Sequence, residues 1–192
     1  AQKGFECVHG NASLAELSES GAKILSTGKS VIHWEEFSIL SNQKVYFEQA
    51  GMNPCVLNRV IGGKSSHLLG ELFSNGSVFL INPNGVLIGS GGRIETSGFL
   101  ASTLDVLDSD FLADKGMLFV KQGEKGKIIH EGKIHCPSGD VFLFASHVEN
   151  QGEIAAPEGC VGVGAGSQIF LSVGGQNRIW IQAGEDTEGT ID

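Results

Sequence analysis

The sequence predicts an all-β protein, a parallel β-solenoid of short coils, from three observations. Glycine is abundant, with 28 glycines and only 4 prolines in 192 residues, and a hydrophobic content of 41% is too high for a disordered chain. Apolar runs on both sides of a tight turn do not alternate with polar residues. The C-terminal half contains segments that repeat at an offset of twenty residues. A chain of this length is expected to form a single domain.

The N-terminal part is expected to form a mostly β cap, residues 1–50, ahead of the coils of residues 51–192. A solenoid end needs a cap because its open strand edge would otherwise pair with other chains. A helical start is the alternative, since Ser13 and Glu16 have the spacing of a capping box. Gly21 interrupts the helical pattern, which favours strands.

The stretch Asn82-Pro83-Asn84-Gly85 predicts a tight turn between two apolar strands. Proline sets φ for the second position of a type I turn, asparagine can bond its own backbone, and glycine accepts a positive φ at the exit. The flanking strands are apolar at consecutive positions, so both of their faces must be covered. A parallel solenoid and a packed sandwich both meet this condition.

An internal repeat favours the solenoid. GKIHCPSGDVFLFASHVENQ (132–151) aligns with GEIAAPEGCVGVGAGSQIFL (152–171), and residues 70–85 share the same order of glycine, polar turn and apolar strand. A period of about 20 residues made of short β-rich segments fits one coil of a solenoid. The alignment predicts how inward-facing residues stack: Ile134 on Ile154, Val141 on Val161 and Leu143 on Val163.

Charge and hydropathy disfavour several partners. The formal charge of −9 and the pI of about 5.1 oppose binding to nucleic acid or to an anionic membrane, because both need clustered Lys and Arg. No run approaches the ~18 apolar residues of a membrane-spanning helix, and the N-terminus AQKGFECVHG lacks the apolar core of a signal peptide. We expect no nucleic-acid partner and no membrane insertion of the chain itself.

The four cysteines lie far apart and form no Cys-x-x-Cys pair, which disfavours a zinc site. Disulfides and buried free thiols both remain open, and free thiols are slightly favoured because cysteine is among the most often buried residue types. The residues concerned are Cys7, Cys55, Cys136 and Cys160.

The motifs predict no catalytic residue, no metal site and no cofactor. Gly63-Lys64-Ser65 would end a phosphate-binding loop, but the position that requires glycine is Asn58. The 6 histidines show no His-Glu-x-x-His motif and no metal-ligand spacing. A group of aspartates could hold calcium in a β-solenoid lyase, yet no motif supplies a basic catalyst, so a solvated acidic loop is favoured. These aspartates are Asp105, Asp108, Asp110 and Asp114.

Several motifs in a fixed order resemble one known family. They are VIHWEEFSI (31–39), VYFEQ (45–49), VLNRVIGGKSSHLLGELFSNGSVFLINPNGVLIG (56–89) and GFLASTLDV (98–106). Together they resemble the N-terminal secretion domain of two-partner-secretion exoproteins, the group of filamentous haemagglutinin and the high-molecular-weight adhesins. Two features depart from the family: Cys55 follows Asn53-Pro54, where haemagglutinin-type members have Asn-Pro-Asn-Leu, and four cysteines are unusual in a chain that threads a pore.

The resemblance implies a right-handed parallel β-helix that acts as a secretion signal and not as an enzyme. The periplasmic POTRA-type domains of a dedicated outer-membrane transporter would recognise it. The chain would cross the pore unfolded, and the domain would template β-helix folding outside the cell. The exoprotein would then lie at the cell surface or in the medium, where it can contact host cells.

The residues expected to matter for recognition are Asn58, Arg59 and the turn residues Asn82, Pro83, Asn84 and Gly85. They serve either the folding of the coil or capture by the transporter, and turn chemistry favours the first role. Alanine at position 58 is expected to leave the fold nearly intact and to weaken capture. The alternative function is a carbohydrate-active or carbohydrate-binding β-helix, although 1 tyrosine and 2 tryptophans are few for a sugar cleft.

Overall fold

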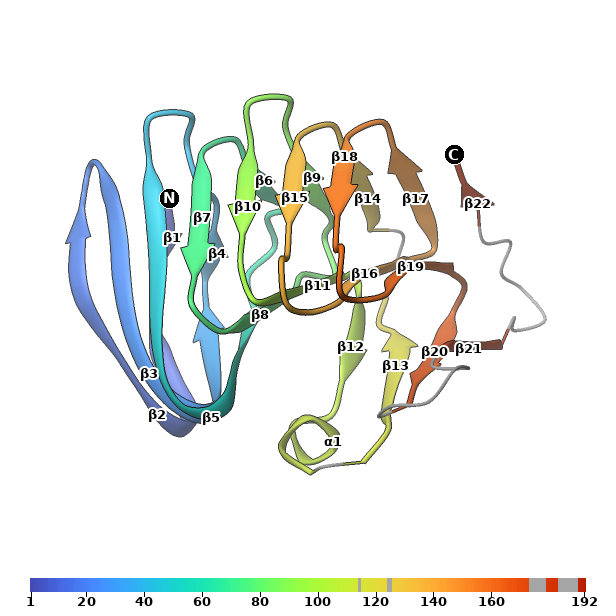
Figure 1. The fold of residues 1–192 in the computed structure, drawn as a ribbon, viewed down its shortest axis with the longest axis horizontal. Helices are drawn as coiled ribbons and strands as arrows, with labels where there is room; N and C mark the ends of the chain where they lie inside the picture. The colour runs from blue at the N-terminus through green and yellow to red at the C-terminus, as the bar shows by residue number, and fades with distance from the viewer. Residues whose placement is uncertain (114, 124–125, 173–178, 183–189) are drawn as a thin grey trace.

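The computed structural model is mostly strand, 64%, and forms a parallel β-solenoid of about 6 turns with a spacing of ~23 residues (Figure 1). It describes residues 1–113, 115–123, 126–172, 179–182 and 190–192. Within these residues, helix is confined to the five-residue α1 (Asp108–Leu112). The expected all-β class is confirmed, and the repeating coils distinguish the solenoid from a packed sandwich.

The solenoid has three faces, and each coil contributes one short strand to each of them. Within a face, the strands of successive coils pair in parallel. The first face contains β7 (Glu71–Ser74), β10 (Arg93–Glu95), β15 (Lys133–His135) and β18 (Glu153–Ala155). The second face contains β8 (Ser77–Ile81), β11 (Gly98–Ser102), β16 (Val141–Ala145) and β19 (Val161–Ala165). The third face contains β6 (Ser66–Leu68), β9 (Val86–Ile88), β14 (Lys127–His130), β17 (His147–Asn150) and β22 (Thr190–Ile191).

The N-terminal end of the solenoid is closed by antiparallel pairs. β1 (Gln2–Lys3) pairs with β4 (Glu36–Phe37), and the mostly exposed β2 (Glu6–Ser18) pairs with β3 (Gly21–Trp34). Ser13 and Glu16 lie within β2, so the helical alternative is wrong. Parallel pairing starts where β5 (Lys44–Val60) joins β3, and the expected boundary at residue 50 falls inside β5.

The predicted twenty-residue register is confirmed residue by residue. Ile134 pairs with Ile154, Val141 with Val161, and Leu143 with Val163. The expectation that Val161 is an inward, buried position is wrong in one respect, because its side chain is 46% exposed whereas that of Val141 is 0% exposed. Val161 belongs to the last strand of its face, where no later strand covers it among the described residues.

Segments that leave the solenoid form an outer layer over the second face. After β11, the chain makes β12 (Leu104–Val106), α1 and β13 (Met117–Lys121) before it returns, so Phe99 pairs with Val141, 42 positions further on. β13 pairs antiparallel with β20 (Gln168–Leu171), which pairs with β21 (Ile179–Gln182). In Figure 1 this layer lies below the coils.

Two hydrophobic cores result, one inside the coils and one beneath the outer layer. Alternate residues of β8 divide between them: Val78 and Leu80 belong to the core inside the coil, and Ile81 belongs to the outer core together with residues such as Phe119. The prediction that these apolar strands are covered on both faces is therefore confirmed. Burial of both faces explains why the residues do not alternate between apolar and polar.

The cysteines are free thiols, in agreement with the favoured state, but not all are buried. Cys55 and Cys136 are buried, Cys7 is intermediate, and Cys160 is exposed because it lies in the turn before β19. The expectation of buried thiols is therefore wrong for Cys160.

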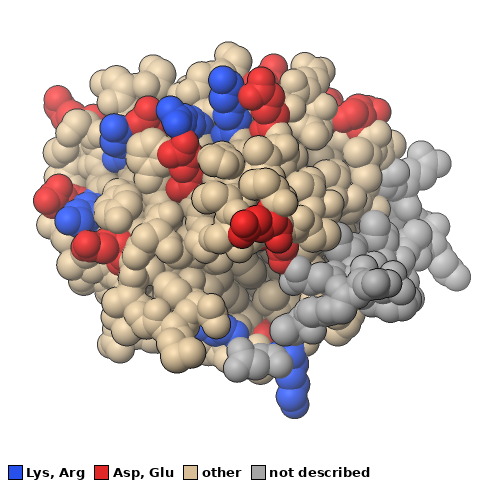
Figure 2. All heavy atoms as spheres, viewed as in Figure 1, with Lys and Arg blue, Asp and Glu red and all other residues tan. Residues whose placement is uncertain are grey.

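The surface of the first face carries charges of both signs along the solenoid axis. Lys44, Glu71, Arg93, Lys133 and Glu153 are successive register partners, and Lys44 lies 3.1 Å from Glu71. Figure 2 shows charged side chains gathered over these strands and a largely uncharged, hollowed surface below them. Opposite charges on neighbouring strands stabilise a sheet modestly. None of the described helices has the length and apolar character of a membrane span.

Candidate recognition site

The turn at residues 82–85 has the predicted chemistry. The backbone N–H of Gly85 donates to the carbonyl of Asn82 at 3.1 Å, and the N–H of Asn84 donates to the side chain Oδ1 of Asn82 at 3.0 Å. Gly85 adopts φ 124°, a conformation that L side chains rarely adopt. Asn82 is completely buried, with 0% exposure.

The two turn asparagines also hold the preceding loop, residues 61–65. Asn82 Nδ2 donates to the carbonyl of Lys64 at 3.0 Å and to Ser66 Oγ at 2.9 Å. Asn84 Nδ2 donates to the carbonyl of Gly62 at 2.8 Å. The glycine-rich stretch that superficially resembles a phosphate loop is therefore a corner of the preceding coil, clamped by the asparagines of the next.

Asn58 lies inside the solenoid. Its Oδ1 accepts a hydrogen bond from the indole Nε1 of Trp34 at 2.9 Å, and its Nδ2 donates to the carbonyl of Phe79 at 3.2 Å. Asn58 is 1% exposed and Trp34 is 0% exposed. Trp34 is thus part of the hydrophobic core, and Asn58 is the polar group that satisfies its buried N–H.

Arg59 points the other way, into the contact between the second face and the outer layer. Its Nε donates to Asp105 Oδ1 at 3.0 Å, its Nη1 lies 2.6 Å from Asp108 Oδ1, and its Nη2 donates to the carbonyl of Val106 at 2.7 Å. The arginine side chain is only 12% exposed. It therefore ties β5 to β12 and to the start of α1.

The expectation of a solvated acidic loop is wrong for most of the aspartates. Asp105 and Asp108 pair with Arg59, and Asp110 Oδ2 accepts a hydrogen bond from the backbone N–H of Leu118 at 3.1 Å. Asp114 lies outside the described residues. The basic partner is 46 positions from Asp105 in the sequence, which is why local motif reading did not find it.

His33 completes the arginine cluster. Arg59 Nη1 lies 3.0 Å from His33 Nε2, and because arginine can only donate, the histidine nitrogen accepts. Burial lowers the pKa of His33, and the Arg59 charge lowers it further against the raising effect of nearby carboxylates. The cluster therefore requires a neutral imidazole.

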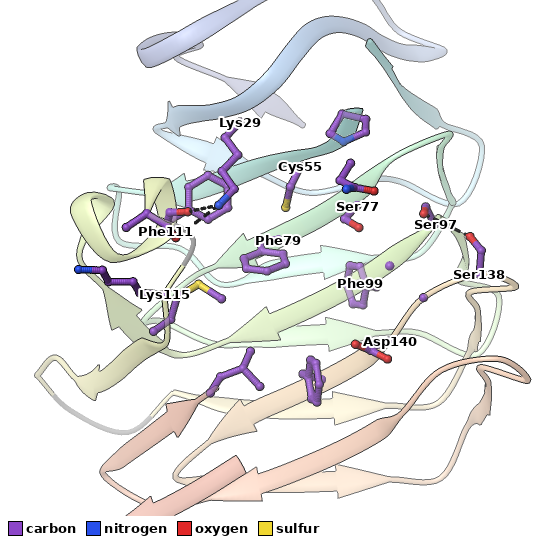
Figure 3. A pocket seen from close by; sticks show the side chains of 18 residues that line it. Lys29, Cys55, Ser77, Phe79, Ser97, Phe99, Phe111, Lys115, Ser138 and Asp140 are labelled. Atoms are coloured by element: carbon purple, nitrogen blue, oxygen red, sulfur yellow. Dashed lines mark hydrogen bonds between the residues drawn. The ribbon is translucent and has the colours of Figure 1, made fainter. Parts of the chain in front are cut away.

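A groove of about 440 Å³ opens between α1 and the second face (Figure 3). Phe79 lines the groove and lies between Cys55 and Phe99. Burial raises the pKa of the Cys55 thiol to about 12, so the sulfur is protonated and is no nucleophile at neutral pH. Lys29 Nζ donates to the carbonyl of Phe111 at 3.0 Å and thereby holds the end of α1.

The predicted recognition residues are neighbours in space but do not form one exposed patch. Asn58 and Arg59 pair in register with Leu80 and Ile81, immediately before the turn at Asn82. Asn58 faces the coil interior, Arg59 the outer layer, and Asn82 the turn. Each stabilises the folded domain through contacts with groups distant in sequence.

Comparisons with known proteins agree on one family. The TPS secretion domain family matches residues 19–191. A heme/hemopexin-binding protein of Haemophilus influenzae is 34% identical over 178 residues, which is 90% of this chain and 19% of that protein. A second heme/hemopexin-binding protein of the same species is 45% identical over 78 residues, 41% of this chain and 8% of that protein.

The solved structures give the same answer for the fold. The crystal structure of the HMW1 secretion domain from Haemophilus influenzae matches with a TM-score of 0.86 and 32% identity, over 100% of this chain and 52% of that chain. The chain spans about a fifth of the length of the first of these relatives. On its sequence, its coils and its outer layer, this chain belongs to the TPS secretion domain family.

Proposed function

We propose that this domain is the signal by which the periplasmic domains of an outer-membrane two-partner-secretion transporter capture a large exoprotein. After passage through the pore, the domain folds and templates β-helix formation outside the cell. Membership of a family of secretion domains supports this proposal, as do relatives several times longer than this chain.

The burial of the motif asparagines supports a particular order of events. Asn58 and Asn82 are 1% and 0% exposed, so a folded domain offers almost nothing of these side chains to a partner. Recognition that depends on them therefore precedes coil closure. At that stage, the strands around these residues have unpaired edges that can add to a sheet of the transporter. Folding then buries the same groups and withdraws the chain from the transporter.

The test separates unfolded from folded binding without altering the motif. Val141→Asp places a carboxylate inside the coil, far along the chain from the motif, and is expected to unfold the domain, whereas the half-exposed Val161→Asp is the matched control. Affinity for the isolated periplasmic domains is measured for both. We expect Val141→Asp to bind at least as tightly as the parent, and Asn58→Ala in that background to bind more weakly.

Two results would overturn the proposal. The first is a folded parent that binds more tightly than the unfolded Val141→Asp variant. The second is an Asn58→Ala change that leaves the affinity of the unfolded chain and the secretion of the exoprotein unaltered.

A carbohydrate-binding role is the second candidate, and a shallow groove of about 500 Å³ on the first face favours it. Tyr46 and Phe73 are register partners on β5 and β7, and both line the groove with Glu95 and His135. Aromatic rings beside a few polar groups are typical of sugar sites. A polysaccharide binding screen with the parent and Phe73→Ala, including cleavage assays with and without calcium, would detect this activity.

A further inference from the structure

A histidine and two carboxylates meet at the C-terminal end of the third face. His147 and Glu149 occupy alternate positions of β17, so both side chains point away from the coil, while Val148 between them is 0% exposed. The following coil adds Thr190 opposite His147. Asp192 is fixed beside Glu149, because its N–H donates to the carbonyl of Val148 at 2.8 Å and its carbonyl accepts from Asn150 at 2.7 Å.

The three side chains converge on a common point. His147 Nε2 lies 3.0 Å from Glu149 Oε1 and 3.5 Å from Asp192 Oδ2. One ligand atom from each residue lies within 4.8 Å of the others. In a tetrahedral zinc site with bonds of about 2.0–2.1 Å, the ligand atoms are about 3.3 Å apart. The two distances to the histidine nitrogen lie on either side of that value.

Two carboxylates stand on adjacent strands at this position. On the first face, neighbouring strands place Lys44 beside Glu71. On the third face, Glu149 stands beside Asp192, and the residue on its other side is Ile129. Like charges on adjacent strands destabilise a sheet. A cation between the two carboxylates would offset this repulsion.

Thr190 supplies the orientation that a metal-binding histidine requires. His147 Nδ1 is in hydrogen-bond contact with Thr190 Oγ1. When Nδ1–H donates to this hydroxyl, the lone pair of Nε2 faces the two carboxylates and is available to a metal. In the competing arrangement, His147 is a protonated imidazolium whose Nε2–H donates to Glu149. That nitrogen then has no lone pair for a metal.

We propose that His147, Glu149 and Asp192 form a divalent transition-metal site, with Thr190 as the positioning residue for the imidazole. One nitrogen and two oxygen ligands suit Zn²⁺, whereas Ca²⁺ takes six to eight oxygen ligands. A fourth position is open to water. Because the ligands come from two successive coils, the ion would fasten β22 to β17.

The probe is Zn²⁺ itself, titrated calorimetrically into the 192-residue chain, with Ca²⁺ in a parallel titration. A Cys7→Ser/Cys160→Ser background removes the two thiols that reach solvent and could bind zinc independently. We expect one equivalent of Zn²⁺ to bind and to raise the melting temperature. His147→Ala, Glu149→Gln and Asp192→Asn should each weaken binding at least tenfold, and Thr190→Val should weaken it about 10–100-fold.

His67→Ala is the matched control, because His67 lies on the same face in β6 and its ring contacts Ser65 Oγ instead of carboxylates. It should bind Zn²⁺ like the parent. Circular dichroism confirms that each variant is folded, and the conservative Glu149→Gln variant keeps the test valid if His147→Ala is unstable. The proposal is overturned if no saturable Zn²⁺ binding occurs, if binding persists in both His147→Ala and Glu149→Gln, or if Ca²⁺ binds as tightly as Zn²⁺.

Discussion

The indole nitrogen of Trp34 donates a hydrogen bond of 2.9 Å to the side chain of Asn58, and both residues are buried in the coil that joins the cap to the solenoid. Trp34 lies on β3 and Asn58 on β5, so this bond connects the first two parallel strands. Asn58 also contacts the next strand through Phe79. One amide thus links three consecutive strands, β3, β5 and β8.

Alanine at position 58 is therefore expected to destabilise the folded domain, contrary to the expectation from sequence. The change leaves the buried Trp34 N–H without its partner, which costs about 1–3 kcal/mol. Urea unfolding of the purified domain measures this loss. Asn84→Ala is the control, because Asn84 is exposed and should cost less. Equal unfolding midpoints for the two variants would contradict the structural role of Asn58.

Valine at position 85 should destabilise the turn. Gly85 has φ 124°, and a β-branched residue at such an angle costs on the order of 1–3 kcal/mol. The control is Gly63→Ala, since a Cβ at Gly63 would meet nothing within 4 Å. Thermal unfolding of both variants checks the prediction, and a Gly85→Val melting temperature equal to that of the control would refute it.

The stacked pair Val141 and Val161 predicts unequal effects of the same substitution. Aspartate at Val141, which is 0% exposed, should cost more than about 3 kcal/mol, because an unpaired carboxylate would be buried. At Val161, which is 46% exposed, the carboxylate stays hydrated and the cost should be small. Denaturant titration should show a nearly parental transition for Val161→Asp and no cooperative transition for Val141→Asp. Comparable losses of stability in the two variants would show that Val161 is buried in solution.

Acidification should destabilise the domain through His33 and His130. Burial is the main cause that lowers the pKa of each, so the unfolded chain takes up protons before the folded domain does. Stability should therefore fall as the pH drops below about 6.5, the pKa of an unperturbed histidine. Unfolding free energies between pH 7 and pH 5 test this.

Histidine replacements identify the source of the pH effect. His33→Gln and His130→Gln should each flatten the pH dependence, whereas exposed His67→Gln should leave its slope unchanged. If the two buried-site variants retain the full slope, other groups cause the acid sensitivity.

The sequence predicted those features of the fold that depend on local patterns of residues. Glycines and apolar residues recur at twenty-residue offsets, so the register of Ile134 on Ile154 could be read directly, and the turn chemistry of Asn82 follows from residue types alone. The role of Arg59 could not be predicted, because its partners Asp105 and Asp108 lie in a segment that leaves the coil. The burial of Asn58 could not be predicted either, since it depends on the direction in which a single strand position faces.

The pairing of β13 with β20 predicts the order in which parts of this domain fold. Met117 meets Leu171, a residue 54 positions later, so the outer layer closes only after the chain has completed more than another full coil. Long-range closures of this kind are slow relative to the addition of a coil to its neighbour. A refolding experiment should therefore show early protection of coil amides from hydrogen exchange, followed by a lag before the amides that pair β13 with β20 are protected. Until that lag ends, the coils are folded, but the apolar residues beneath the outer layer stay accessible to water.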